Sequence, residues 1–215
     1  MLKYQRKLIH YENLFENETP IIVGSGPTDF DYKDLDKLKN PILFINDSVF
    51  LGDKKGRYFF THHPDIERWL SLKSTYIFAE TRNKKPYTEK RPEGPYVPIH
   101  LKSNQIRGHA GKFLAHERIP SWTLDKKYMI EHNILFSHWG SITSLIHFIW
   151  FCGAKKAIGI GISKDYENSN HDSRIPLNYE IKEPEYIGKC KGLKQIIHNQ
   201  EVCLDFFKIN MEYYK

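Results

Sequence analysis

The stretch that most constrains this chain covers residues 19–28, with the sequence Thr-Pro-Ile-Ile-Val-Gly-Ser-Gly-Pro-Thr. Three consecutive β-branched residues after a proline predict a short strand that is buried on both faces, as in a parallel sheet. Gly24 and Gly26 follow at once, so the backbone can turn sharply and leave amide groups free to meet phosphate oxygens. An ordinary Gly-Pro turn explains the same residues, and the third glycine of a full dinucleotide fingerprint is missing. The stretch therefore predicts either a plain turn or a variant nucleotide site.

Two further strands are predicted to end in polar residues. Residues 41–45 read as a buried strand followed by Asn46 and Asp47, and residues 57–60 as a third strand followed by Thr-His-His-Pro at 61–64. The carboxyl ends of parallel strands meet at one edge of a sheet, where ligands bind. Loop solvation explains each polar group taken alone, whereas three in succession favour a shared cleft.

The later part of the chain adds a helix, a strand and a polar loop. Gly140 and Ser141 precede an apolar run, and a buried strand over residues 155–162 follows it. Ser141 is predicted to cap the helix, whose first turn would favour an anion, although a serine cap without a ligand is the simpler interpretation. The loop after the strand contains Tyr166 and His171, in the place where catalytic side chains commonly lie. A solvated loop histidine explains His171 equally well.

The remaining segments complete the expected fold. Short helices are predicted over residues 31–38 and 65–72, and a strand over residues 74–79. Residues 82–98 are rich in Pro, Lys, Arg and Glu without periodicity, which is typical of a long exposed loop or lid. Apolar residues at helical spacing predict a C-terminal helix over residues 192–213. We expect one α/β domain over residues 1–215, Rossmann-like, with a mostly parallel sheet, helices on both faces and a lid-like insertion.

Composition narrows the expected partners. Lys and Arg number 32 against 26 Asp and Glu and are spread along the chain, which favours an anionic small ligand or surface over a nucleic-acid groove. Three cysteines without metal spacing indicate a reducing compartment. His109, His116 and Glu117 match no metal motif, and no apolar run is long enough to span a bilayer. We expect a cytoplasmic protein, with peripheral contact with the inner face of the membrane and oligomerisation both left open.

The order of several short motifs resembles that of the bacterial lipooligosaccharide sialyltransferases and, more loosely, the related motility-associated glycosyltransferases. The motifs are Val23-Gly-Ser-Gly-Pro-Thr28, Phe44-Ile-Asn-Asp47, Phe60-Thr-His-His-Pro64, Gly140-Ser141 before an apolar helix, Gly153-Ala-Lys-Lys-Ala-Ile-Gly-Ile-Gly-Ile162 and Glu185-Tyr-Ile-Gly188. The resemblance implies an inverting, metal-independent glycosyltransferase of surface glycan (lipopolysaccharide) biosynthesis. Its donor would be a CMP-linked acidic sugar, its acceptor a glycan, and no cofactor would be needed. The residues that it places around the nucleotide are Gly24, Ser25, Gly26, Asn46, His63 and Ser141. Asp47, next to Asn46 at the end of the second strand, is predicted as a further nucleotide contact.

This chain departs from the family pattern near the chemistry. The family has asparagine at the positions of Ser25 and His63, and its general base is a histidine where this chain has Lys189. A lysine with its ordinary pKa is protonated at neutral pH and cannot accept a proton. Tyr166 matches the first of two family tyrosines that hold the leaving phosphate, and the second falls near His171. Either His171 acts as the acid or base, or the transferase chemistry is altered or lost. In the second case the chain is a binding module that keeps the nucleotide cleft without turnover, or a related enzyme that transfers a phosphate-linked group to a different acceptor.

Overall fold

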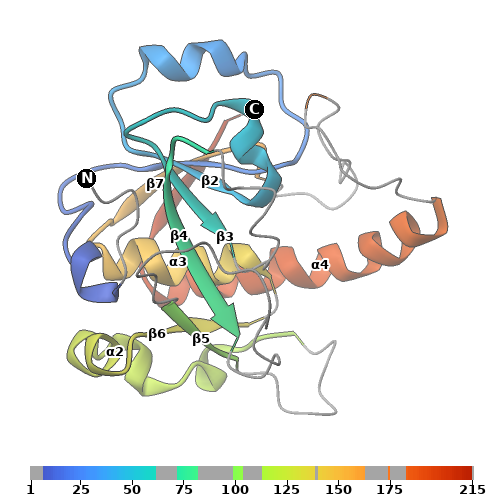
Figure 1. Ribbon diagram of the computed structural model, residues 1–215. Helices are drawn as coiled ribbons and strands as arrows, with labels where there is room; N and C mark the ends of the chain where they lie inside the picture. The colour runs from blue at the N-terminus through green and yellow to red at the C-terminus, as the bar shows by residue number, and fades with distance from the viewer. Residues whose placement is uncertain are drawn as a thin grey trace, which may run out of the picture.

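The computed structural model describes residues 7–61, 72–81, 99–103, 113–138, 140–162, 174 and 183–214. Within these ranges the chain forms an eight-stranded sheet in the order β6-β5-β4-β3-β2-β1-β7-β8, and every neighbouring pair is parallel (Figure 1). The strands are β1 (Ile21–Val23), β2 (Ile42–Ile45), β3 (Tyr58–Thr61), β4 (Thr75–Thr81), β5 (Ile99–Ser103), β6 (Ile134–Ser137), β7 (Lys156–Ile160) and β8 (Asn210–Tyr213). The α-helices are α2 (Lys126–His132), α3 (Ser141–Phe151) and α4 (Glu183–Phe206), and the 3-10 helices are η1 (Leu8–Tyr11), η2 (Tyr32–Lys37), η3 (Asn46–Leu51), η4 (His116–Arg118) and η5 (Ser121–Leu124). The predicted Rossmann-like α/β fold is confirmed.

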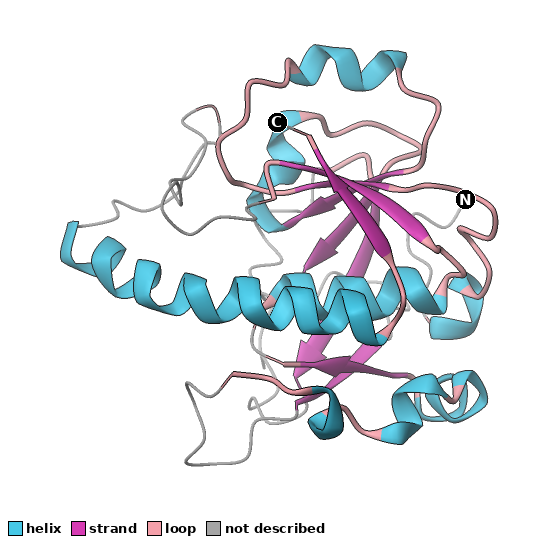
Figure 2. Ribbon diagram, turned by 180° about the vertical axis from the view of Figure 1, so that it is seen from behind, coloured by secondary structure: helices cyan, strands magenta, loops and turns pink. Residues whose placement is uncertain are grey.

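Alternate side chains of the central strands β1 and β2 pack on opposite faces of the sheet. Ile22 and Leu43 lie in the larger core, together with α3 and the C-terminal part of α4. Ile21 and Val23 lie in a second core with η2 and η3. Figure 2 shows α4 crossing the face of the sheet that is hidden in Figure 1. Because β1 is buried on both faces, all three of its residues are apolar.

A buried histidine of α3 holds the edge strand β6 in place. The Phe136 amide donates a hydrogen bond to Nδ1 of His147 (2.8 Å), so Nε2 carries the proton and donates to the carbonyl oxygen of Thr123 (2.9 Å). The imidazole also stacks on Phe207, with ring centroids 4.7 Å apart. Burial lowers the pKa of His147 to about 4, so the imidazole is neutral at pH 7.

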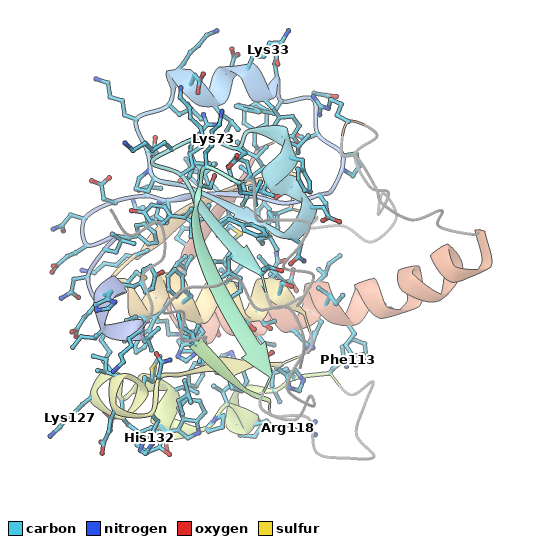
Figure 3. The ribbon with its side chains drawn as sticks, in the orientation of Figure 1. Lys33, Lys73, Phe113, Arg118, Lys127 and His132 are labelled. Atoms are coloured by element: carbon cyan, nitrogen blue, oxygen red, sulfur yellow. The ribbon has the colours of Figure 1, made fainter. Side chains whose placement is uncertain are left out.

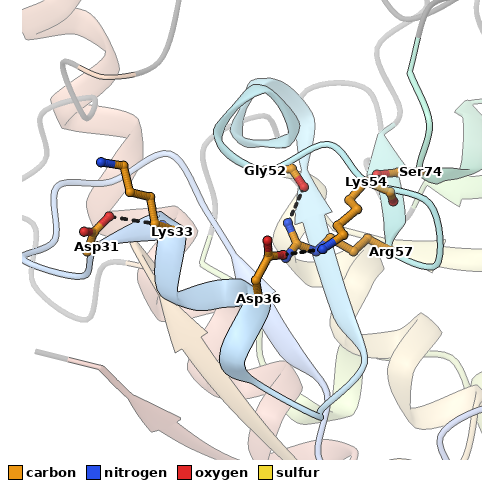
Figure 4. Close-up of polar contacts among 7 residues, drawn as sticks. All are labelled: Asp31, Lys33, Asp36, Gly52, Lys54, Arg57 and Ser74. Atoms are coloured by element: carbon orange, nitrogen blue, oxygen red, sulfur yellow. Dashed lines mark hydrogen bonds and ion pairs between the residues drawn. The ribbon is translucent and has the colours of Figure 1, made fainter.

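Charged side chains join the elements on the second face of the sheet (Figure 4). η2 begins after Asp31, whose carboxylate accepts a hydrogen bond from the Lys33 amide (3.0 Å). Near the end of η2, the Asp36 carboxylate accepts from Arg57 (2.6 Å) and from Lys54 (2.9 Å). The Lys54 hydrogen bond, with the positive charges of Lys54 and Arg57, lowers the pKa of the Asp36 carboxyl. The network connects η2 to the turn that leads into β3.

The strands predicted at residues 41–45, 57–60, 74–79 and 155–162 are confirmed as β2, β3, β4 and β7. The sequence does not predict β5, β6 or β8. The C-terminal helix predicted over residues 192–213 is wrong in its bounds, because α4 ends at Phe206 and the chain turns through Lys208 (φ 54°) into β8. In β8 the buried Met211 lies between two exposed residues, which is the alternation of a strand rather than of a helix.

Two predicted segments have little or no description. Of the helix predicted over residues 65–72, only Leu72 belongs to the described ranges, where it is buried in the second core. The lid predicted over residues 82–98 lies entirely outside them. No helix in the part of the chain that the structure describes is long and apolar enough to cross a membrane.

Candidate functional site

The strand order places a switch point between β1 and β7. From β1 the sheet grows outward through β2, β3, β4 and β5 to β6, and the chain then returns through α3 to add β7 on the other side of β1. In open parallel sheets, ligands bind outside the carboxyl ends of the strands at such a point. The candidate site is therefore built from the residues that follow β1, β2, β3 and β7, and from the beginning of α3.

The glycine turn after β1 packs directly against the chain that follows β7. The amide of Gly24 donates to the carbonyl oxygen of Ile160 (2.8 Å), and the amide of Gly26 donates to that of Gly161 (2.8 Å). A Cβ atom on Gly24 would lie 2.5 Å from the carbonyl oxygen of Gly161. The expectation that this turn leaves amide groups free for phosphate is thus corrected for Gly24 and Gly26: these glycines allow two backbones to approach each other. Ser25, half-buried between them, is the remaining predicted contact of this turn.

Asn46 links three elements at the carboxyl edge of the sheet. Its backbone has the left-handed conformation (φ 51°), which asparagine adopts more readily than most residues. Its side-chain amide donates to the hydroxyl of Ser141 at the start of α3 (3.1 Å), and its carbonyl oxygen accepts from the hydroxyl of Thr61 at the end of β3 (2.9 Å). Thr61 and Ser141 are buried, whereas Asn46 is half-buried. The sequence predicted Asn46 and Ser141 for this site, and the structure brings them together.

Ser48 fixes the position of Asn46 relative to the glycine turn. Its buried hydroxyl donates to the carbonyl oxygen of Val23 (2.6 Å) and accepts from the amide of Ile45 (3.0 Å). The ends of β1 and β2 are therefore joined through one side chain. Asp47, predicted as a nucleotide contact, lies half-buried between Asn46 and Ser48 in η3. No pattern in the sequence points to Ser48, because a serine three residues beyond a strand is not distinctive.

Ser141 does not cap α3, which corrects a second expectation. The residue before the helix is Gly140 (φ 116°), and α3 has no side-chain capping hydrogen bond. The Thr143 hydroxyl lies 3.0 Å from the carbonyl oxygens of both His138 and Gly140. The Ser141 hydroxyl instead lies beside Asn46, so the serine contributes a polar group to the site rather than stability to the helix end.

The structure does not describe several of the residues predicted for the chemistry. His63, Tyr166 and His171 lie outside the described residues. Lys189 lies in the first third of α4. Because α4 leads into β8, which is parallel to the other strands, the helix begins on the carboxyl side of the sheet. Figure 1 shows the first half of α4 extending beyond the sheet.

The described residues contain no group of three or more His, Cys, Asp or Glu side chains that could hold a metal ion. Of the histidines considered for zinc, His116 pairs with Asp205 on α4 (3.0 Å), and His109 lies outside the described ranges. Comparison of the chain with family models, with curated proteins and with solved structures found no match. The resemblance to the sialyltransferases accordingly stays a prediction.

Proposed function

We propose that this chain is an inverting glycosyltransferase whose donor nucleotide lies at the carboxyl edge of the sheet, beside Asn46. The observation that carries the proposal is the hydrogen-bonded group of Asn46, Thr61 and Ser141, in which three elements bring polar side chains together next to the switch point. The resemblance in sequence assigns Asn46 and Ser141 to the same nucleotide. Their contact in space supports that assignment independently of the order of motifs.

The proposed donor is a CMP-linked acidic sugar and the proposed acceptor a hydroxyl of a surface glycan. The acceptor oxygen attacks the anomeric carbon from the face opposite the phosphate, and the bond between that carbon and the phosphate oxygen breaks. CMP leaves with the bonding electrons, and the acceptor proton passes to a base, for which His171 is the candidate. Tyr166 and Ser141 are the candidates for hydrogen bonds to the leaving phosphate, and Lys189 for binding the sugar carboxylate.

A nucleotide-binding module without turnover is the second candidate. One feature favours it: Lys189 stands where the resembling family has its histidine base. Such a module would use the polar group of Asn46, Thr61 and Ser141 to bind CMP or its sugar conjugate.

The first test measures nucleotide binding. Calorimetry with CMP, UMP, AMP, GMP and NAD should show the tightest binding for CMP. Asn46→Asp should weaken CMP binding by about tenfold or more, because a carboxylate repels the phosphate and cannot donate to Ser141. Asn40→Asp is the matched control, since Asn40 donates a similar hydrogen bond to the carbonyl oxygen of Thr19 (2.9 Å) but precedes β2 at the opposite edge. Preference for NAD, or equal effects of the two substitutions, would contradict the assignment.

The second test separates the enzyme from the binding module. His171→Ala should lower turnover with a CMP-linked acidic sugar by about a hundredfold, the usual effect of losing an acid or base, while CMP affinity stays nearly unchanged. Lys189→His restores the residue type of the resembling family and should raise transfer if Lys189 limits it. Suppose that the wild type and both variants bind CMP but transfer nothing from CMP-, UDP- or GDP-sugars. The enzyme would then be rejected in favour of the binding module.

A further inference from the structure

The chain after β1 and the chain after β7 are joined at three successive levels. The first two are the hydrogen bonds that the Gly24 and Gly26 amides donate to carbonyl oxygens at the end of β7. Further out, the guanidinium of Arg174 donates to the carbonyl oxygens of Phe30 (2.9 Å) and Thr28 (2.7 Å). The contact between the chain after β1 and the chain after β7 thus begins with backbone hydrogen bonds at the sheet. The side chain of Arg174 extends it further from the sheet.

Aromatic rings organise the loop that Arg174 contacts. The guanidinium carbon of Arg174 lies 4.4 Å from the ring centroid of Tyr32. The Tyr32 ring meets Phe30 edge to face at 5.9 Å, and Phe30 meets Tyr214 in the same way at 5.0 Å. Arg174 is exposed, whereas Phe30 and Tyr32 are buried. An exposed arginine that uses two backbone carbonyls and a ring face is oriented by the loop and in turn restricts it.

We propose that Arg174 is a positioning residue, which fixes the loop over residues 24–32 in the shape that binds the nucleotide beside Asn46. This role rests on the proposed function. The contacts that carry this role are to two carbonyl oxygens of the loop and to the face of one ring. Planar, two-pronged donation combined with stacking is specific to arginine, and lysine cannot reproduce it.

The experiment compares Arg174→Gln and Arg174→Lys with the wild type. Hydrogen exchange should become about tenfold faster for amides of residues 26–35, because losing about 1.4 kcal/mol of local contacts opens the loop by that factor. CMP affinity should fall by a similar factor. The midpoint of global unfolding should stay unchanged, since Arg174 is exposed and outside both cores. Lysine should behave like glutamine.

Arg118→Gln is the matched control. Arg118 is also an exposed arginine that donates to a backbone carbonyl, that of Phe113 (3.3 Å), and Figure 3 shows it at the opposite end of the molecule from Lys33 on η2. It should alter neither loop exchange nor CMP affinity. Unchanged exchange in the Arg174 variants would overturn the proposal, and so would faster exchange with unchanged CMP affinity. If the wild type binds no nucleotide, the proposed function fails, and the exchange result still decides whether Arg174 fixes the loop.

Discussion

Replacing Gly161 with alanine should destabilise the protein by about 2–5 kcal/mol, from the combined costs of a left-handed alanine and of a steric overlap. Gly161 has a φ of 61°, and a Cβ atom there would lie 2.7 Å from the carbonyl oxygen of Gly26 and 3.0 Å from that of Gly24. Both neighbours are backbone atoms, so neither can rotate away. Urea unfolding at pH 7.5 measures the loss of stability directly.

Gly56→Ala separates the two causes. Gly56 also has a positive φ (91°), but no heavy atom lies within 4 Å of the Cβ position. This substitution should cost only the backbone strain, about 1–2 kcal/mol. If Gly161→Ala costs no more than Gly56→Ala, the close approach of the two turns is not a determinant of stability. If Gly161→Ala costs more than Gly56→Ala, the glycines after β1 and β7 are needed because each leaves room for the backbone of the other turn.

Protein stability should fall by about 3 kcal/mol between pH 7.5 and pH 4 because of His147 alone. Its pKa is about 6.5 in an unfolded chain and about 4 in the folded protein. Between these values the unfolded state binds a proton that the folded state does not, so acid favours unfolding. Above pH 6.5 both states are neutral and the contribution of His147 no longer changes with pH. Urea unfolding at pH 7.5, 6.0 and 5.0 measures the slope.

His147→Phe isolates this effect. The variant cannot titrate, but it leaves the Phe136 amide and the Thr123 carbonyl without their partner, at a cost of about 1–3 kcal/mol each at pH 7.5. The difference in stability between the wild type and this variant should therefore shrink as the pH falls. Ile146→Val, at the neighbouring buried position of α3, is the control. Its free energy of unfolding should be about 1 kcal/mol below that of the wild type at every pH. If the free energy of unfolding changes with pH in parallel for the wild type and His147→Phe, His147 is not the source of the pH dependence.

The sheet was predictable where a strand is central and the sequence is continuously apolar. β1, β2 and the strands paired with them, β3 and β7, are short apolar runs bounded by Gly, Pro or polar residues, so local sequence specifies them. β8 was misread as helix because Val202, Phe206 and Ile209 keep helical spacing up to its first residue, and the four residues of β8 are too few to show a strand rather than a helical pattern. Pairing with β7 decides between them, and pairing is a long-range contact that no local pattern contains.

For the site, the sequence by itself determined which residue types end the strands: glycines after β1, Asn46 after β2, and Ser141 before α3. Only the tertiary structure decided what they do, because their roles depend on distances between segments far apart in the chain. The amides of Gly24 and Gly26 meet the end of β7 instead of remaining free, and the hydroxyl of Ser141 meets Asn46, 95 residues away, instead of capping its own helix. A hydrogen-bonding group takes whichever partner the packed fold brings within reach, and folding of the whole sheet, not local sequence, sets that choice.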